Sequence, residues 1–273
     1  QNFRDKKFDF SELWIVEGES AKESVKNARS GLFQAIYAVR GKMTNALKTP
    51  IEAILGTEKS TKDGKKREGS KEIKEIISLI GAGVEIEGLE DESFDISNSR
   101  FSKIVMATDA DEDGYQIRVL IFVMFWKLMP EIIRQGMLYI AESPKFGITL
   151  RDGNRLYAVK DEDRIKLENE YAGQITRVER YKGLGQVNAE VLAQTTMDPE
   201  TRVMTQIQLN PADEDLNTVI ETIFGSDPLK KRKETLMQLL GTDVMGMFEE
   251  NSEMLNMIER SEYQEEVEEV EYV

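Results

Sequence analysis

Apolar and polar residues are grouped in blocks along this chain. The sharpest change from apolar to polar residues comes directly after residues 104–108. Ile104–Thr108 carries apolar or small side chains and is typical of a buried strand. An acidic segment follows and ends at Gly114, and Ile117–Met129 is then apolar almost all round, which predicts a helix buried between layers. The pattern therefore predicts acids on a loop between a core strand and a core helix. Open α/β sheets bind their ligands at such strand ends.

A second strand, turn and helix of this kind lies near the N-terminus. Glu12–Val16 is a short apolar strand, and Glu17 follows it directly. Ser20 and Glu23 form a capping-box pattern, which predicts a helix that starts at Ser20 and runs to Gly31. Glu17 thus occupies the same kind of place as the acidic segment. This repetition favours a shared site over a surface carboxylate in a turn.

The remaining blocks predict alternating strands and helices. Strands are expected at 34–39, 137–141, 149–159 as a hairpin, 175–178 and 203–209. Helices are expected at 73–80, 160–172, 189–195 with Asn188 as the cap, 213–224 and 229–240. The polar, Lys-rich stretch 56–71 is interpreted as a mobile loop with possible contacts to a nucleic-acid backbone. The order of elements predicts an α/β fold with a parallel sheet flanked by helices.

Composition narrows the classes of function. The 273 residues suffice for one large or two small domains, and the net charge of -15 argues against a protein that coats DNA by charge alone. The chain has no Cys and no His, which excludes disulfides, thiolate or imidazole metal sites and a His-based triad. No segment resembles a membrane span or a signal peptide, so we expect a cytoplasmic protein. The chain begins with Gln1 rather than Met, so we expect a fragment or a processed piece.

The acidic segment carries the strongest chemical signal. Asp109, Asp111 and Asp113 alternate with other residues before Gly114, and three close carboxylates repel one another. Oxygen-only ligands point to a hard cation such as Mg2+. An EF-hand loop begins in the same way, but its twelfth position needs a bidentate Glu, and Leu120 stands there. A solvated acidic turn without a ligand is the other alternative.

Two short basic segments also contain glycine. Arg40 and Lys42 flank Gly41, and Lys182 precedes a Gly-Leu-Gly sequence. Cations beside glycine let the backbone approach an anion closely, so both segments are candidates for phosphate contact. A basic turn at the surface is the alternative for each.

Five motifs occur in a fixed order: EGESA at 17–21, RGK at 40–42, TDADEDG at 108–114, RYKGLGQ at 180–186 and TTMDPETR at 195–202. Together they resemble the Toprim region of the ATPase-bearing subunit of bacterial type IIA topoisomerases, which comprises the gyrase B subunit and its topoisomerase IV counterpart. The resemblance covers about Glu12 to Leu209 and extends toward Gly241. The last two motifs are the most specific to this group of topoisomerases, whereas a Glu followed by Asp-x-Asp is shared by all Toprim proteins.

The chain departs from the family pattern at a few positions. Glu19 replaces an Asp, Tyr115-Gln116 replaces Ala-His, and Gln186 replaces a Glu. The acids expected to bind metal are intact, whereas local DNA contacts and drug sensitivity are put in doubt. The family's N-terminal ATPase and transducer domains are missing from this sequence. A phage or divergent bacterial enzyme with split subunits would account for these features.

The resemblance implies a Rossmann-like Toprim sheet and a reversible transesterification of DNA. In this family the attacking Tyr belongs to the partner subunit, so this chain is assigned the metal half of the site. Glu17, Asp109 and Asp111 are then expected to hold Mg2+, with Asp113 completing a second metal position and Mn2+ able to substitute. Glu17 could also act as general acid to the 3′-oxygen, although a metal ligand would be ionised.

Further roles follow from the same resemblance. Lys42 joins Glu17 as a catalytic residue, and Arg40, Lys42 and Lys182 are hypothesised to contact the DNA backbone. Expected partners are double-stranded DNA, a Tyr-bearing gyrase A-like subunit and an ATPase domain or subunit, in a heterotetramer or a larger split-subunit assembly. The predicted division is a metal-binding domain at 1–145, a partner-contacting C-terminal α+β extension at 146–241 and a disordered acidic tail at 242–273.

Two other classes of function remain open from the residues themselves. A Toprim primase or nuclease would use the same acids, although a primase is expected to lack RYKGLG. A non-catalytic DNA-binding scaffold could hold a structural cation with them.

Overall fold

The computed structural model describes residues 10–57, 69–86, 93–209, 216–226 and 228–240. The chain forms two compact units, Gln1–Leu209 and Asn210–Val273, and each is described by itself. In the second unit, helices α9 (Leu216–Phe224) and α10 (Leu229–Leu240) pack against each other. The stretch 58–68 and the tail from residue 241 lie outside the described residues, so the predictions made for them stay predictions.

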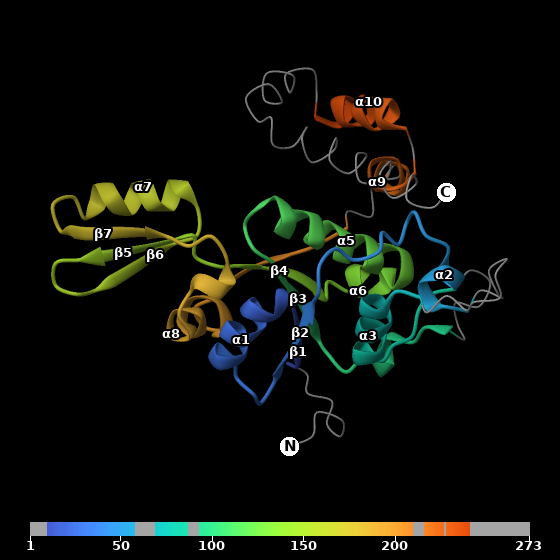
Figure 1. Cartoon of the computed structure of the whole chain (residues 1–273), viewed down its shortest axis with the longest axis horizontal. Coiled ribbons are helices and arrows are strands. Elements are labelled where there is room, and N and C mark those ends of the chain that lie inside the picture. Colours follow the sequence, from blue (N-terminus) through green and yellow to red (C-terminus); the bar gives the residue numbers. More distant parts are fainter. Residues whose placement is uncertain (1–9, 58–68, 87–92, 210–215, 227, 241–273) are drawn as a thin grey trace, which may run out of the picture. The chain divides into compact units, whose positions relative to one another are not determined.

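A five-stranded sheet forms the centre of the first unit (Figure 1). Its order is β2-β1-β3-β4-β8, with the first four strands parallel and β8 antiparallel at one edge. The strands are β1 (Glu12–Glu17), β2 (Gln34–Val39), β3 (Lys103–Ala107), β4 (Leu138–Glu142) and β8 (Val203–Gln206). The predicted α/β fold with a parallel-dominated sheet is therefore confirmed.

Helices cover both faces of this sheet, as Figure 1 shows. One face carries α1 (Gly18–Ala28) and α8 (Ala189–Leu192), which a π-helical turn extends to Met197. The other face carries α2 (Ile51–Leu55), α3 (Lys71–Ile80), α5 (Glu112–Leu128) and α6 (Pro130–Arg134). Helix α3 contributes three buried isoleucines: Ile73, Ile76 and Ile80.

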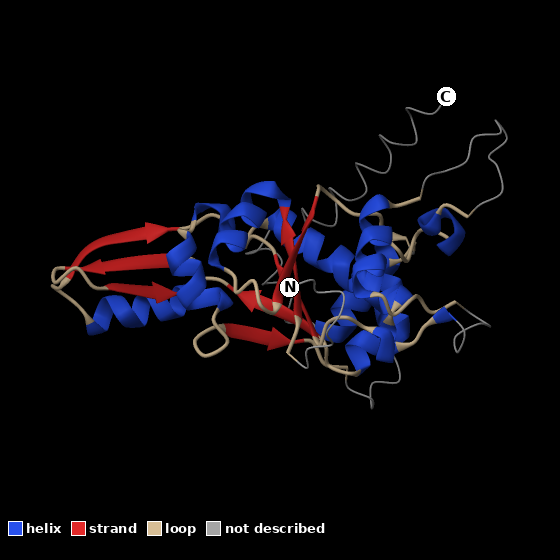
Figure 2. Cartoon of the chain, turned by 90° about the horizontal axis from the view of Figure 1, so that it is seen from below, coloured by secondary structure: helices blue, strands red, loops and turns tan. Residues whose placement is uncertain are grey.

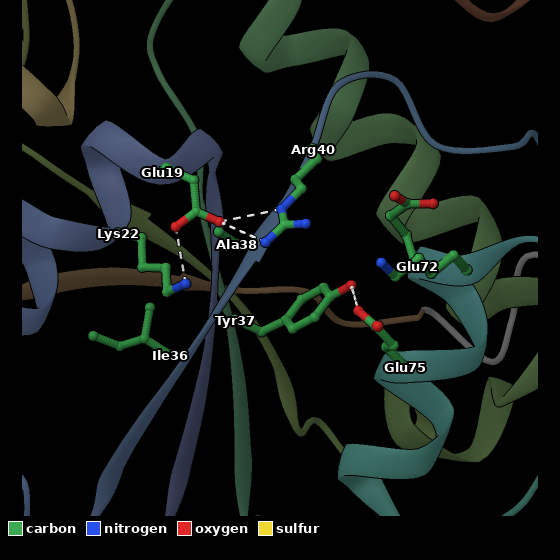
Figure 3. Close-up of a pocket in the computed structure, with 9 residues that line it drawn as sticks. Glu19, Lys22, Ile36, Tyr37, Ala38, Arg40, Glu72 and Glu75 are labelled. Carbon is green, nitrogen blue, oxygen red and sulfur yellow. Dashed lines mark hydrogen bonds and ion pairs between the residues drawn. The ribbon is translucent and has the colours of Figure 1, made fainter.

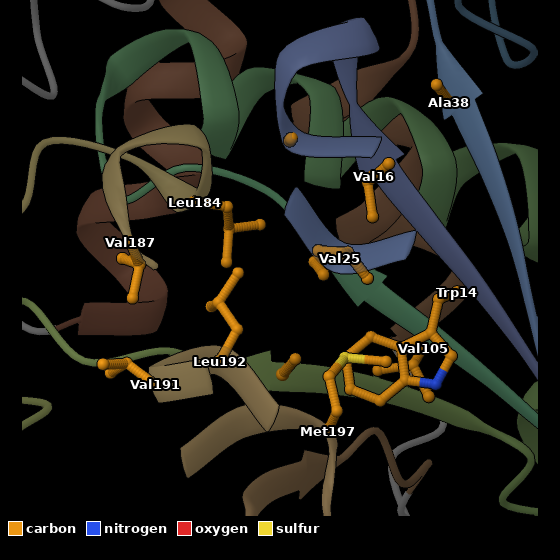
Figure 4. Packing of buried hydrophobic residues seen from close by; sticks show 13 residues of the cluster. Trp14, Val16, Val25, Ala38, Val105, Leu184, Val187, Val191, Leu192 and Met197 are labelled. Atoms are coloured by element: carbon orange, nitrogen blue, oxygen red, sulfur yellow. The ribbon is translucent and has the colours of Figure 1, made fainter. Parts of the chain in front are cut away.

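The first face has a well-defined apolar core (Figure 4). Trp14 and Val16 of β1 contribute to it, because alternate side chains of a strand point to the same side. Val25 comes from α1, Leu192 from α8 and Leu184 from the residues shortly before α8. The core therefore joins the start of the unit to a segment far away in sequence.

A smaller antiparallel sheet, order β6-β5-β7, follows the main sheet in the sequence and is visible as a separate group of strands in Figure 2. It consists of β5 (Phe146–Leu150), β6 (Arg155–Ala158) and β7 (Ile175–Arg180), with α7 (Asp161–Glu170) between the last two. The hairpin predicted around Asp152-Gly153 is confirmed, because β5 and β6 pair antiparallel across it.

The main sheet has a topological switch point between β1 and β3. The chain passes from β1 through α1 to β2 on one side, and then crosses to β3 on the other side of β1. Open α/β sheets bind ligands in the crevice outside the carboxyl ends of such a strand pair. Glu17 ends β1, and Asp109 follows β3 by two residues, so the fold brings the two acidic turns to this point.

Two local predictions were wrong, and a third was right in position only. Helix α1 begins at Gly18 rather than Ser20, and no side chain caps it, because the chain turns directly after Glu17. Helix α5 begins at Glu112, so Asp113 lies in its first turn rather than on a loop. Asn188 is at the N-cap of α8, but its side chain makes no capping hydrogen bond.

Candidate metal centre

Glu17 stands where β1 turns into α1, and the turn depends on the next residue. Gly18 has φ = 74°, a left-handed conformation, and a Cβ there would meet no heavy atom within 4 Å. Glycine is therefore required at this position for its backbone and not for space. Glu17 Oε2 is buried and has no hydrogen-bond partner among the described residues. A buried carboxylate oxygen without a partner is costly, and a cation bound there would offset that cost.

The Asp triplet is built around the start of α5. Asp111 is the N-cap, and its Oδ1 accepts the N–H of Gly114 at 2.8 Å. A Cβ on Gly114 would lie 2.2 Å from the carbonyl oxygen of Asp109, so the turn closes too tightly for any side chain there. The positive end of the helix dipole stabilises the carboxylates in this turn.

The acids raise one another's affinity for protons. Burial and the charge of Asp109 raise the pKa of Glu17 above its ordinary value, although a backbone hydrogen bond from Asp109 opposes this. The charges of Asp111 and Asp113 add to the raised pKa of Glu17. Burial raises the pKa of Asp109 as well, while the backbone N–H of Leu184 acts against it and Asp111 adds to it. A cation placed among these groups would relieve both the repulsion and the desolvation.

The donor set suits a hard divalent cation such as Mg2+. All the groups are carboxylates, and the partnerless Oε2 of Glu17 is available as a ligand. Within the described residues, no three acidic side chains already converge closely enough to share one ion. Carboxylate rotations would therefore accompany binding, and the fit rests on the chemistry of the donors and on the partnerless oxygen.

The predicted DNA-contacting cations Arg40, Lys42 and Lys182 have different surroundings. The Nζ of Lys42 lies 3.6 Å from Oδ1 of Asp113, so Lys42 is at the edge of the acidic cluster. Arg40 instead pairs with Glu19 at 3.1 Å. Lys182 is exposed. The structure thus brings Lys42 beside Asp113 and places Arg40 in a different ion pair.

Figure 3 shows the small hollow that Arg40 lines, between α1, β2 and α3. Lys22 also binds Glu19, at 2.9 Å, and the hydroxyl of Tyr37 donates to Glu75 at 2.7 Å. Burial, followed by the Glu75 hydrogen bond, raises the pKa of Tyr37 above its usual range. The Arg40–Glu19 pair thus joins the end of β2 to α1, and the Tyr37–Glu75 hydrogen bond joins β2 to α3.

The RYKGLG segment contacts the side chain of Asp109, and this contact was not predicted from the sequence. The backbone N–H of Leu184 donates to Oδ1 of Asp109 at 2.8 Å, and a Cβ on Gly183 would lie 2.1 Å from Oδ2 of the same side chain. The glycine was expected to approach phosphate, but it faces a carboxylate. The contact joins residues 75 positions apart, and no local pattern signals it.

A buried ionic network at the other end of β1 was also missed. Glu12 and Arg202 form an ion pair whose side chains are only 2% and 4% exposed. Trp14 Nε1 and Gln34 Nε2 each donate to Oε2 of Glu12 at 3.0 Å, and Gln34 also donates to the carbonyl of Met197 at 2.9 Å. In the sequence, the sign of this network was a Glu at the start of an otherwise apolar strand. The network explains Arg202, the last residue of the TTMDPETR motif, as a structural residue.

Known sequence families match two parts of the chain. The Toprim domain matches residues 12–143, and the carboxyl terminus of the DNA gyrase B subunit matches residues 173–237. Among the described helices, none has both the length and the apolar character needed to cross a membrane.

Individual relatives agree with these matches. The B subunit of DNA gyrase from Thermotoga maritima is 34% identical over 223 residues, which are 82% of this chain and 32% of the relative. The gyrase B subunit of Archaeoglobus fulgidus is 37% identical over 221 residues, 81% of this chain and 31% of the relative. The B subunit of DNA topoisomerase 4 from Mycoplasma capricolum is 37% identical over 228 residues, 84% of this chain and 32% of the relative. The chain thus spans about a third of the length of these relatives.

Proposed function

Because this chain belongs to the Toprim-containing family formed by the B subunits of gyrase and topoisomerase IV, we propose that it forms the metal-binding half of a type II topoisomerase cleavage site. The observation that supports this most is the meeting of Glu17 and the Asp triplet at the switch point of the sheet. Burial and the charges of the Asp triplet raise the pKa of Glu17, which is the arrangement expected of groups that share a cation.

The proposed reaction is a reversible transesterification of DNA. A Tyr hydroxyl of the partner subunit attacks a DNA phosphorus, the bond from phosphorus to the Tyr oxygen forms, and the bond to the 3′-oxygen breaks. A bound Mg2+ supplies charge neutralisation on the non-bridging and leaving oxygens. In the whole enzyme, this step would allow strand passage driven by ATP.

The chain's residues take distinct roles in this proposal. Glu17, Asp109 and Asp111 would hold the catalytic ion, and Asp113 would complete a second position. Lys42 lies 3.6 Å from Asp113 and would balance charge where the DNA backbone arrives. Arg40 and Lys182 would contact the backbone farther from the reacting phosphate.

A plasmid cleavage assay with detergent trapping tests the proposal. This chain is combined with its native Tyr-bearing and ATPase-containing partners, with and without Mg2+. Asp111→Asn is a sharper variant than Asp111→Ala, because Asn caps a helix as well as Asp does and the 2.8 Å bond to Gly114 can persist. We expect Asp111→Asn to lower covalent cleavage about 100-fold or more, since an ion at such a site is worth several kcal/mol in the transition state.

The control is Glu23→Gln, which removes an exposed acid of α1 and is expected to cleave normally. DNA attached to this chain rather than to the partner would overturn the proposal. So would unchanged cleavage by Asp111→Asn. RNA primer synthesis or cleavage by this chain alone would indicate a Toprim primase or nuclease instead.

A further inference from the structure

The turn after β7 reaches the metal centre through one acid. The backbone N–H of Leu184 donates to Oδ1 of Asp109 at 2.8 Å, across 75 residues of sequence. Gly183 lies against the other oxygen, because a Cβ built on it would be 2.1 Å from Oδ2 and 2.5 Å from Cγ of Asp109. Both oxygens of this carboxylate are therefore constrained by the same turn.

The conformation of Gly183 shows why glycine is needed there. Its φ of -170° and ψ of 169° are extended backbone, which every residue adopts readily. Glycine is therefore needed at residue 183 for a different reason from that at Gly18, whose φ is positive. Space against the Asp109 carboxylate is the remaining reason. A side chain at residue 183 would displace that carboxylate, since the tip of an Asp moves more easily than backbone.

The turn itself is firmly held. Leu184 is 1% exposed and packs into the core beneath α1 and α8 (Figure 4). The N–H of Gln186 donates to the carbonyl of Gly183 at 3.0 Å, and the side chain of Gln186 accepts the N–H of Lys182 at 3.0 Å. The turn can therefore impose a position on Asp109 rather than follow it.

We propose that the turn 182–186 is the positioning element of the metal centre: it selects the orientation of the Asp109 carboxylate, and Gly183 leaves the space for it. Gly183 and Leu184 act through Asp109 and are positioning residues. The step from orientation to metal affinity rests on the proposed function, whereas the contact with Asp109 does not. Groups that orient a metal ligand typically affect metal affinity by about 10- to 100-fold.

The first experiment measures Mn2+ binding to the purified chain by electron paramagnetic resonance, with Mg2+ as competitor. Gly183→Ala is compared with Gly31→Ala, whose Cβ meets nothing within 4 Å and whose φ is not positive. We expect Gly183→Ala to weaken Mn2+ binding about 10-fold or more. Gly31→Ala is expected to bind as the wild type does. Equal Mn2+ affinity of Gly183→Ala and wild type would overturn the positioning role.

The second experiment tests the contact without metal. Thermal unfolding is measured in EDTA for wild type, Gly183→Ala, Asp109→Ala and the double variant. We expect Gly183→Ala to lower the Tm by about 2–4 °C when Asp109 is present. In the Asp109→Ala background, the same change is expected to lower the Tm by less, because the opposing carboxylate is gone. An equal loss in both backgrounds would show that Gly183 acts elsewhere, and would overturn the proposal.

The two experiments separate this inference from the proposed function. If the wild-type chain binds no Mn2+, the proposed metal centre is wrong. The unfolding experiment would still test the contact between Gly183 and Asp109. Suppose instead that Gly183→Ala weakens Mn2+ binding but the wild-type chain forms no covalent DNA complex with its partners. The positioning role would then stand, and the topoisomerase function would be wrong.

Discussion

The two glutamates at the ends of β1 have opposite environments. Glu12 begins the strand and is bound by Arg202, Gln34 and Trp14. Burial alone would raise its pKa, but the hydrogen bonds to these three side chains outweigh burial and lower it. Glu17 ends the strand, its Oε2 has no hydrogen-bond partner among the described residues, and burial beside other acids raises its pKa.

The comparison separates an acid that is fully paired within the chain from one that is not. A buried charge is stable only when it is paired and hydrogen-bonded, and Glu12 meets both conditions within the chain. Glu17 meets them only in part: the backbone of Asp109 hydrogen-bonds to it, but the Asp109 charge adds repulsion, and Glu17 Oε2 has no hydrogen-bond partner among the described residues. The folded chain therefore tolerates repulsion at one end of β1 and offsets the cost of burial at the other, which is typical of a binding site beside a stable core.

Breaking the Glu12 network should give the largest change in stability. Arg202→Met leaves Glu12 buried without its cation, and we expect the free energy of unfolding to fall by about 3–5 kcal/mol. Denaturant unfolding measures this. The matched control is Arg134→Met, which removes the exposed partner of Glu131 and should cost less than about 1 kcal/mol. Equal losses in the two variants would contradict the structural role of the buried pair.

Supplying a cation should remove the repulsion at Glu17. We expect Mg2+ to stabilise the wild-type chain by about 2.7 kcal/mol when its concentration is 100 times the Kd, because a ligand that binds only the folded state shifts unfolding by mass action. Glu17→Gln should lose most of this stabilisation, while Glu12→Gln, at the other end of β1, should keep it. Thermal scans across a Mg2+ titration test the difference. Equal stabilisation of both variants would place the ion elsewhere.

The smallest effect is expected in the pH dependence of stability. The lowered pKa of Glu12 contributes stability that is present above its ordinary value of 4.5 and is lost as the pH falls through the lowered pKa. The raised pKa of Glu17 has the opposite sign, with stability present below 4.5 and lost as the pH rises through the raised pKa. Near pH 7 without metal, Glu17→Gln should therefore stabilise the chain by about 1 kcal/mol or less.

Unfolding free energies measured from pH 3 to pH 8 test this contrast. The advantage of Glu17→Gln over wild type should shrink as the pH falls toward 4.5. Glu12→Gln should be less stable than wild type near neutral pH, and the gap should narrow only in more acidic solution. Parallel curves for the two variants would show that their environments do not differ as described.

The sequence predicted the parts of the site that depend on local patterns. Apolar runs end at Glu17 and just before Asp109, and strand ends follow such runs closely, so both acids were placed correctly relative to β1 and β3. The start of α1 was misplaced because Ser20 looked like a cap. The left-handed turn at Gly18 lets the helix begin earlier, and a sequence pattern does not report φ.

Contacts across long stretches of sequence could not be predicted. Glu12 and Arg202 are 190 residues apart, and nothing in either neighbourhood indicates the other. Gly183 was interpreted as a residue that lets the backbone approach phosphate, because a Gly beside a cation suits that role. Only the folded position of Asp109 shows what fills the space beside it. The family's short motifs mark these places, but their physical reasons become visible in three dimensions.

The bond between Leu184 and Asp109 also sets an order of events during synthesis. A nascent chain that has just exposed the Asp triplet still lacks the backbone amide that orients its first carboxylate, which is encoded 75 residues later. At about 5–20 residues per second, translation supplies that amide roughly 4–15 s afterwards. The acidic turns thus emerge from the ribosome well before the segment that orients Asp109. The Asp109 carboxylate is therefore free to rotate in that interval, and its orientation is fixed only when the later segment folds back onto it.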